Sequence, residues 1–203
     1  MLTNDIIQII FAFLSIKEVY LIKKNIPNLD VDILLYCKYT NIEKLLDMNT
    51  ASCRGYLQVV QYLINIDIKY CVSVMNYASM HGHLDIVKYL HSIGKNCNDR
   101  AMELASRDGH LEIIKYLHDI GKNCTEDAMD LASSNGYLDI VKYLHSIGKN
   151  CSYRAIDWAS RNGHLEVIKY LHSIGKHFTN NAIYFASLNG HLEVVKYLHN
   201  ICI

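Results

Sequence analysis

The ten glycines of this chain recur with a strict period of 27 residues. They occupy only two positions of the repeating unit, Gly55, Gly82, Gly109, Gly136, Gly163 and Gly190 at the first, and Gly94, Gly121, Gly148 and Gly175 at the second. Self-similarity at a period of about 20 to 50 residues is typical of a solenoid, in which each unit buries its apolar face against its neighbours. The sequence therefore predicts a stack of identical supersecondary units.

Each unit predicts two helices joined by a tight turn. In the unit around Gly109, Ala101 and Ala105 lie on one side of an inner helix and are small enough for close packing against another helix. Gly109 ends that helix, and a second, outer helix is expected from about His110 to Ile120, where apolar residues follow helical spacing. Side-chain oxygens just before the inner helices predict N-caps at Asn98, Thr125, Ser152 and Thr179.

Composition restricts the class of protein. The 203 residues include 20 basic and 20 acidic side chains, so the chain lacks the basic field with which nucleic-acid and anionic-membrane binders attract their targets. The apolar run Ile6 to Leu14 is shorter than the about 20 residues of a bilayer span. The seven cysteines are odd in number and unclustered, which favours free thiols. We expect a mostly helical, cytoplasmic, non-secreted protein with neither nucleic-acid nor membrane partners.

The repeating string A-S-x-x-G-H-L-E-V-V-K-Y-L, most complete at Ala186 to Leu198, resembles the ankyrin repeat, and the string G-K-N-C-T resembles that family's G-A-D-V-N. The unit is about six residues shorter than the about 33 of the family, and the gap falls where ankyrin units carry a β-hairpin finger. The resemblance implies an all-α, ankyrin-type helix-turn-helix solenoid with shortened or absent fingers, with about six repeats in residues 47–203. Short units of this kind resemble ankyrin-repeat proteins of giant DNA viruses of amoebae, which implies virus–host interaction in the host cytoplasm.

Residues 1–46 are expected to form a separate helical segment that includes a degenerate repeat. The stretch from Leu2 to Val19 resembles the start of an F-box, which implies binding to the Skp-type adaptor of a cullin ubiquitin ligase. The residues that would bind the adaptor are Ile6, Ile10, Phe11 and Leu14. The alternative is that this amphipathic stretch caps the first repeat.

Histidine and cysteine are the residues most suggestive of chemistry, but their placement argues against an active site. Nine of the 11 histidines keep the repeat period: His83, His110, His164 and His191 after the turn glycine, and His91, His118, His145, His172 and His199 late in the outer helix. A residue repeated in every unit indicates a repeated structural task, such as a hydrogen bond to the neighbouring loop. Cys97, Cys124 and Cys151 form no C-x-x-C pair, and the next unit has Phe178 at that position. We expect no enzyme, no cofactor and no metal site.

The positions that differ most between units predict where a partner binds. They fall at i, i+3 and i+7 of the inner helices, which places them on one stripe of the concave side. The predicted protein-binding residues are Arg100, Glu103, Arg107, Asp127, Asp130, Ser134, Arg154, Asp157, Arg161, Asn181, Tyr184 and Leu188. Trp158 is expected to be half-buried. The sequence thus favours a non-enzymatic module that binds an unidentified protein, with a ubiquitin-ligase substrate receptor and a degenerate paralogue without a partner as alternatives.

Overall fold

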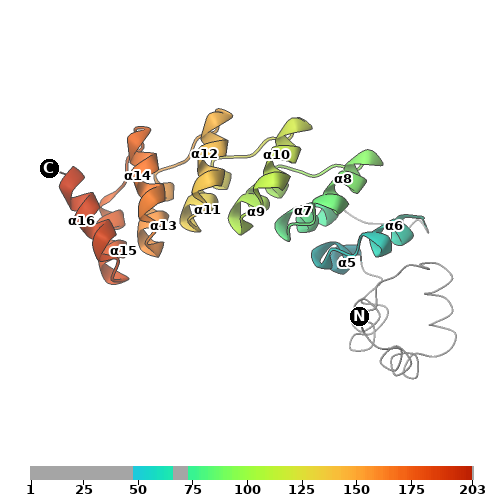
Figure 1. Ribbon diagram of the computed structural model, residues 1–203, viewed down its shortest axis with the longest axis horizontal. Coiled ribbons are helices and arrows are strands. Elements are labelled where there is room, and N and C mark those ends of the chain that lie inside the picture. The colour runs from blue at the N-terminus through green and yellow to red at the C-terminus, as the bar shows by residue number, and fades with distance from the viewer. Residues whose placement is uncertain (1–47, 66–72, 203) are drawn as a thin grey trace, which may run out of the picture. The chain divides into compact units, whose positions relative to one another are not determined.

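The computed structural model describes residues 48–65 and 73–202, and every regular element in these ranges is an α-helix. The helices are α5 (Met48–Arg54), α6 (Leu57–Asn65), α7 (Ser73–Met80), α8 (Leu84–Ser92), α9 (Arg100–Asp108), α10 (Leu111–Asp119), α11 (Asp127–Ser134), α12 (Leu138–Ser146), α13 (Arg154–Asn162), α14 (Leu165–Ser173), α15 (Asn180–Leu188) and α16 (Leu192–Ile201) (Figure 1). The predicted all-α class is confirmed in these residues, because none of their connections contains a β-strand.

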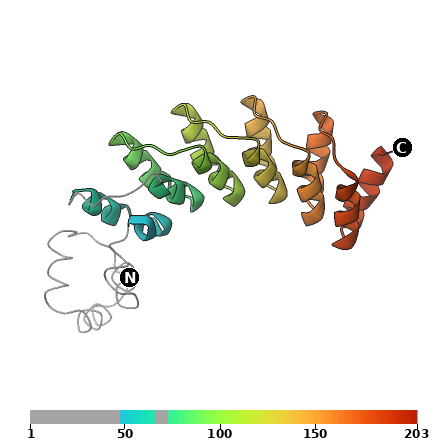
Figure 2. The ribbon, with the colours of Figure 1, turned by 180° about the vertical axis from the view of Figure 1, so that it is seen from behind.

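The chain divides into two compact units. The first includes α5, α6, most of α7 and most of α8, and within it α5 packs against α6 and buries Ala51, Val60 and Leu63. The second includes residues 79–84 and everything from Cys97 onward. In this second unit the inner helices α9, α11, α13 and α15 contact one another in sequence order, and each packs against the outer helix that follows it (Figure 2).

The hairpin of α13 and α14 shows why the sequence folds in this way. Ala155 and Ala159 are completely buried, and their small side chains let α13 lie close to both α11 and α15. On α14, Val167, Ile168 and Leu171 lie at helical spacing and are at most 2% exposed. Each hairpin therefore contributes one small-residue helix and one aliphatic helix to a core that is completed by its neighbours.

A glycine with positive φ ends α13. Gly163 has φ of +81°, and the N–H of His164 donates a hydrogen bond to the carbonyl oxygen of Ala159 at 2.9 Å. This is the left-handed helix ending that glycine adopts at least cost. The predicted role of the turn glycines is confirmed, since all ten have positive φ.

Hydroxyl side chains cap the inner helices. The Oγ1 of Thr179 accepts a hydrogen bond from the N–H of Asn181 at 3.1 Å, which makes Thr179 the N-cap of α15 as predicted. Ser152 and Thr125 accept the same type of bond, from Arg154 at 3.1 Å and Asp127 at 3.3 Å, but each lies one residue further from its helix. At Asn98 it is the backbone carbonyl oxygen that accepts a hydrogen bond at the start of the inner helix, from the N–H of Ala101.

The F-box-like stretch, with Ile6, Ile10, Phe11 and Leu14, lies outside the described residues, as does the whole predicted segment 1–46. The division at residue 46 and the choice between cap and F-box stay predictions. No helix in the described ranges is both long and apolar enough to cross a bilayer.

Candidate protein-binding face

One face of the inner helices in the second unit stays exposed or half-exposed. It comprises the side chains at i, i+4 and i+7 of each helix, which lie on one side of a helix. We call it the inner-helix face, and it consists of Arg100, Leu104 and Arg107 on α9, Asp127, Leu131 and Ser134 on α11, Arg154, Trp158 and Arg161 on α13, and Asn181, Phe185 and Leu188 on α15. On α15 the inner-helix face also includes Tyr184, at i+3, which is 61% exposed. Trp158 is half-buried, as expected.

The structure corrects the sequence prediction at the i+3 positions. Asp130 is completely buried and Asp157 is only 4% exposed, so the fold constrains these carboxylates instead of leaving them free to vary. Asp157 accepts hydrogen bonds from the N–H and the hydroxyl of Thr179, at 3.0 and 2.6 Å. These carboxylates connect one repeat to the cap of the next and do not belong to an exposed binding surface.

Two further residue pairs connect neighbouring repeats through a carboxylate and a hydroxyl residue. The N–H and hydroxyl of Ser152 donate to Asp130 at 2.9 and 2.5 Å, and the hydroxyl of Thr125 donates to Glu103 at 2.6 Å. Each partner pair is 22 residues apart. Burial raises the pKa of Asp130, and the bonds from Ser152 and the charge of Arg154 oppose that shift.

Arg154 connects α13 to α11 through ion pairs. Its guanidinium lies 2.7 Å from Asp127, 3.3 Å from Asp130 and 3.9 Å from Glu126, and its central carbon is 5.2 Å from the ring centroid of Trp158. Because its charge is compensated by three carboxylates of the same chain, Arg154 mainly stabilises the contact between repeats.

Aromatic rings of one hairpin cover the turn glycine of the preceding hairpin. An added Cβ at Gly136 would lie 2.5 Å from Nδ1 of His164, and at Gly109 it would lie 2.8 Å from the ring of Tyr137. The Nε2 of His191 lies 3.0 Å from the carbonyl oxygen of Arg161 and therefore donates to it, since a carbonyl only accepts. The predicted structural role of these histidines is confirmed here, with the bond going to the last turn of the preceding inner helix.

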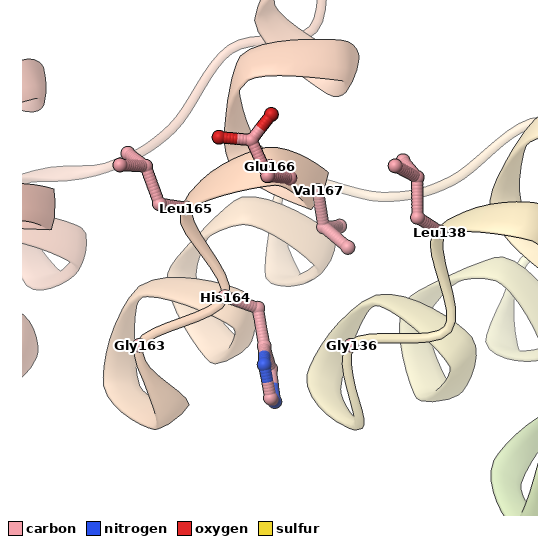
Figure 3. Close-up of a pocket in the computed structure, with 7 residues that line it drawn as sticks. All are labelled: Gly136, Leu138, Gly163, His164, Leu165, Glu166 and Val167. Atoms are coloured by element: carbon pink, nitrogen blue, oxygen red, sulfur yellow. The ribbon is translucent and has the colours of Figure 1, made fainter.

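The turns of the α11–α12 and α13–α14 hairpins border a hollow of about 320 Å³. It is lined by Gly136, Leu138, Gly163, His164, Leu165, Glu166 and Val167, and Figure 3 shows the His164 ring between the turns at Gly136 and Gly163. Burial lowers the pKa of His164, while its hydrogen bond to the backbone of Ser134 opposes the shift. Both titratable groups of the hollow make structural contacts, since the His164 ring covers Gly136 and Glu166 forms an ion pair with Lys169 at 2.7 Å.

Histidines late in the outer helices bond to tyrosines of the next outer helix. The Nδ1 of His145 lies 2.8 Å from the hydroxyl of Tyr170, and that of His172 lies 3.0 Å from the hydroxyl of Tyr197. The outer helices are therefore linked by one bond per repeat, which the sequence analysis did not identify.

The chain matches the family model for ankyrin repeats (3 copies) over residues 48–128, 75–155 and 128–202. It belongs to the ankyrin-repeat family. The ankyrin repeat is a scaffold typical of non-enzymatic protein–protein interaction, and no catalytic family is indicated.

Solved structures agree with this assignment. The ankyrin repeat domain of human ASB11 superimposes with a TM-score of 0.62 at 15% sequence identity, over 75% of this chain and 82% of that one. At this identity the likeness shows the ankyrin fold alone. No curated protein matches the sequence significantly.

Three cysteines at equivalent positions of successive repeats, Cys97, Cys124 and Cys151, are buried. Burial raises the pKa of the Cys124 and Cys151 thiols to about 11, and the pKa of Cys97 is raised for the same reason. Within residues 48–65 and 73–202, no three histidine, cysteine or acidic side chains gather closely enough to hold a metal ion. These thiols contribute to packing at the position that the family fills with a small apolar residue.

Proposed function

We propose that this ankyrin-repeat chain is a non-enzymatic module that binds a partner protein through the inner-helix face. The observation that carries the proposal is the division of tasks along each inner helix. On α9, α11 and α13 the side chain at i+3 makes bonds between repeats, whereas the side chains at i, i+4 and i+7 of all four inner helices stay exposed or half-exposed. Stacking makes these side chains one continuous surface.

The test compares two matched triple variants of the tagged full-length chain. The first replaces three exposed residues of the inner-helix face (Arg100→Ala, Arg161→Ala, Leu188→Ala), and the second replaces three exposed residues of outer helices (Lys169→Ala, Glu193→Ala, Lys196→Ala). Proteins that co-purify with the full-length chain should be lost with the first variant and retained with the second. Retention with the first would contradict the proposal. Failure of the full-length chain to retain any protein would favour a degenerate paralogue without a partner.

A second candidate function is recognition of substrates for a cullin ubiquitin ligase. It is supported by the F-box-like pattern of Leu2 to Val19, in which Ile6, Ile10, Phe11 and Leu14 would bind the Skp-type adaptor. A purified Skp-type adaptor should bind the full-length chain and not a chain lacking residues 1–24. If binding to the adaptor is absent, and the deletion instead destabilises the repeats, the segment is a cap.

The free thiols support a reducing compartment such as the cytoplasm. The resemblance to short ankyrin repeats of viral origin supports a host protein as the partner.

A further inference from the structure

Aromatic and aliphatic side chains gather at the α13–α15 end of the inner-helix face. We call this the aromatic patch, and it consists of Trp158, Arg161, Tyr184, Phe185 and Leu188. Tyr184 is 61% and Leu188 is 68% exposed, and the rings of Tyr184 and Phe185 lie 5.6 Å apart. Tryptophan, tyrosine and arginine are the residues most enriched where a few side chains supply most of the binding energy.

The aromatic patch contains one charge that the described residues do not compensate. The Arg161 guanidinium lies over the Phe185 ring, 5.8 Å from its centroid, and makes no ion pair in the described part of the chain. The nearest candidate acid in sequence, Asp157, is buried and bonded to Thr179. Helix α15 itself carries no charged side chain.

These observations define what would bind best. A guanidinium that contacts a ring through its charge keeps N–H groups that can donate two parallel hydrogen bonds to a carboxylate. The exposed side chains of Tyr184 and Leu188 are one helical turn apart and offer an apolar surface beside that charge. We infer that the aromatic patch recognises a partner protein segment in which an aspartate or glutamate stands next to a large apolar side chain.

This inference rests on the proposed function and names the chemistry of its partner. A protein segment is favoured over nucleic acid, although arginine and aromatic residues also bind bases. A phosphate backbone is attracted by clustered basic charge. On α13 the other arginine, Arg154, is compensated by Asp127, Asp130 and Glu126, which would repel phosphates.

The test is selection of a phage-displayed library of random peptides on the full-length chain. We expect the selected peptides to share an acidic residue beside an aromatic or large aliphatic one. Their dissociation constants should rise about tenfold or more with Arg161→Ala and stay unchanged with Lys169→Ala, an exposed lysine on α14. Arg161→Glu should select peptides with a basic residue instead. Since Arg161 is exposed, these variants should keep the helical circular dichroism of the parent.

The outcomes separate this inference from the proposed function. One outcome would overturn the inference and leave the inner-helix face as the binding site. In that outcome the selected peptides have no acidic residue, bind less tightly to Tyr184→Ala or Leu188→Ala, and bind Arg161→Ala as tightly as the parent. If no substitution on the inner-helix face changes the dissociation constants of the selected peptides, or if no peptide is selected, the result would count against both the inference and the proposed function. A fluorescent oligothymidine is the nucleic-acid probe. If it binds more tightly than every selected peptide, and if its binding depends on Arg161, the inference is overturned in favour of nucleic acid.

Discussion

The carboxylate of Asp157 accepts two hydrogen bonds from Thr179, one from its backbone N–H at 3.0 Å and one from its hydroxyl at 2.6 Å. Thr179 in turn caps α15, so the inner helix of one repeat fixes the start of the next. Asp130 accepts the same two bonds from Ser152, and Glu103 accepts one from the hydroxyl of Thr125.

Replacing Asp157 with alanine should destabilise the last two repeats. The substitution removes both bonds and leaves polar groups of Thr179 without their acceptor, which typically costs about 1–3 kcal/mol. Asp157→Asn should cost less, because the amide oxygen still accepts one bond. Urea unfolding followed by circular dichroism measures both variants, and equal stability of Asp157→Ala and the parent would contradict this account of the connection.

Replacing Gly136 with alanine should cost more than replacing Gly148. Both glycines have positive φ, +79° and +76°, which costs an L-residue about 1–2 kcal/mol. Only at Gly136 would the new Cβ also meet the His164 ring, at 2.5 Å, whereas nothing lies within 4 Å of it at Gly148. Overpacking of this kind adds about 1–3 kcal/mol. Equal loss of stability in the two variants, measured by thermal or urea unfolding, would show that the ring does not cover Gly136.

Acidification should destabilise the fold through His164. Burial lowers its folded-state pKa below 6.5, so the unfolded chain takes up the proton first. The stability that neutral His164 contributes is present above about pH 6.5 and is lost as the pH falls through the lowered folded pKa. His164→Tyr should remove this dependence and keep the fold at neutral pH, because Tyr137 covers Gly109 in the same manner. Parallel pH profiles of the unfolding free energy for parent and variant would contradict the prediction.

The buried thiols should resist alkylation. With a pKa of about 11, Cys124 and Cys151 are ionised to only about one part in a thousand near pH 8, and their burial also blocks access. Cys202 is exposed and should react first with iodoacetamide. Mass spectrometry of peptides from the native chain, with a urea-unfolded sample as control, measures each site. Equal rates at all three cysteines in the native chain would contradict their placement.

The sequence predicts the ankyrin hairpins well because their determinants are local. Turn glycines, buried alanines and aliphatic spacing lie within a few residues of the structure they specify, and the periodic histidines were correctly assigned a structural task. The prediction is wrong for Asp130 and Asp157, because a position whose residue type differs between units can still be buried and bonded.

The sequence does contain a pattern that indicates the structural role of Asp130 and Asp157. An acidic residue precedes a hydroxyl residue by 22 positions in three successive units, from Glu103, Asp130 and Asp157 to Thr125, Ser152 and Thr179. In the last unit Tyr184 takes the acidic position and is exposed. The half-exposed stripe at i+4, with Leu104 and Leu131, was missed because apolar residues are assigned to the core by default, and only the packing of adjacent repeats shows that one edge stays open.

The central claim, that a partner occupies the inner-helix face, is tested most directly by hydroxyl-radical footprinting. The comparison is between the free full-length chain and its purified complex with a protein that it captures. Aromatic side chains on the two sides of the ankyrin stack serve as reporters, Trp158, Tyr184 and Phe185 on the inner helices and Tyr143, Tyr170 and Tyr197 on the outer helices. The account predicts slower oxidation of the first three on binding and no change in the others. Protection of the outer tyrosines alone would contradict it.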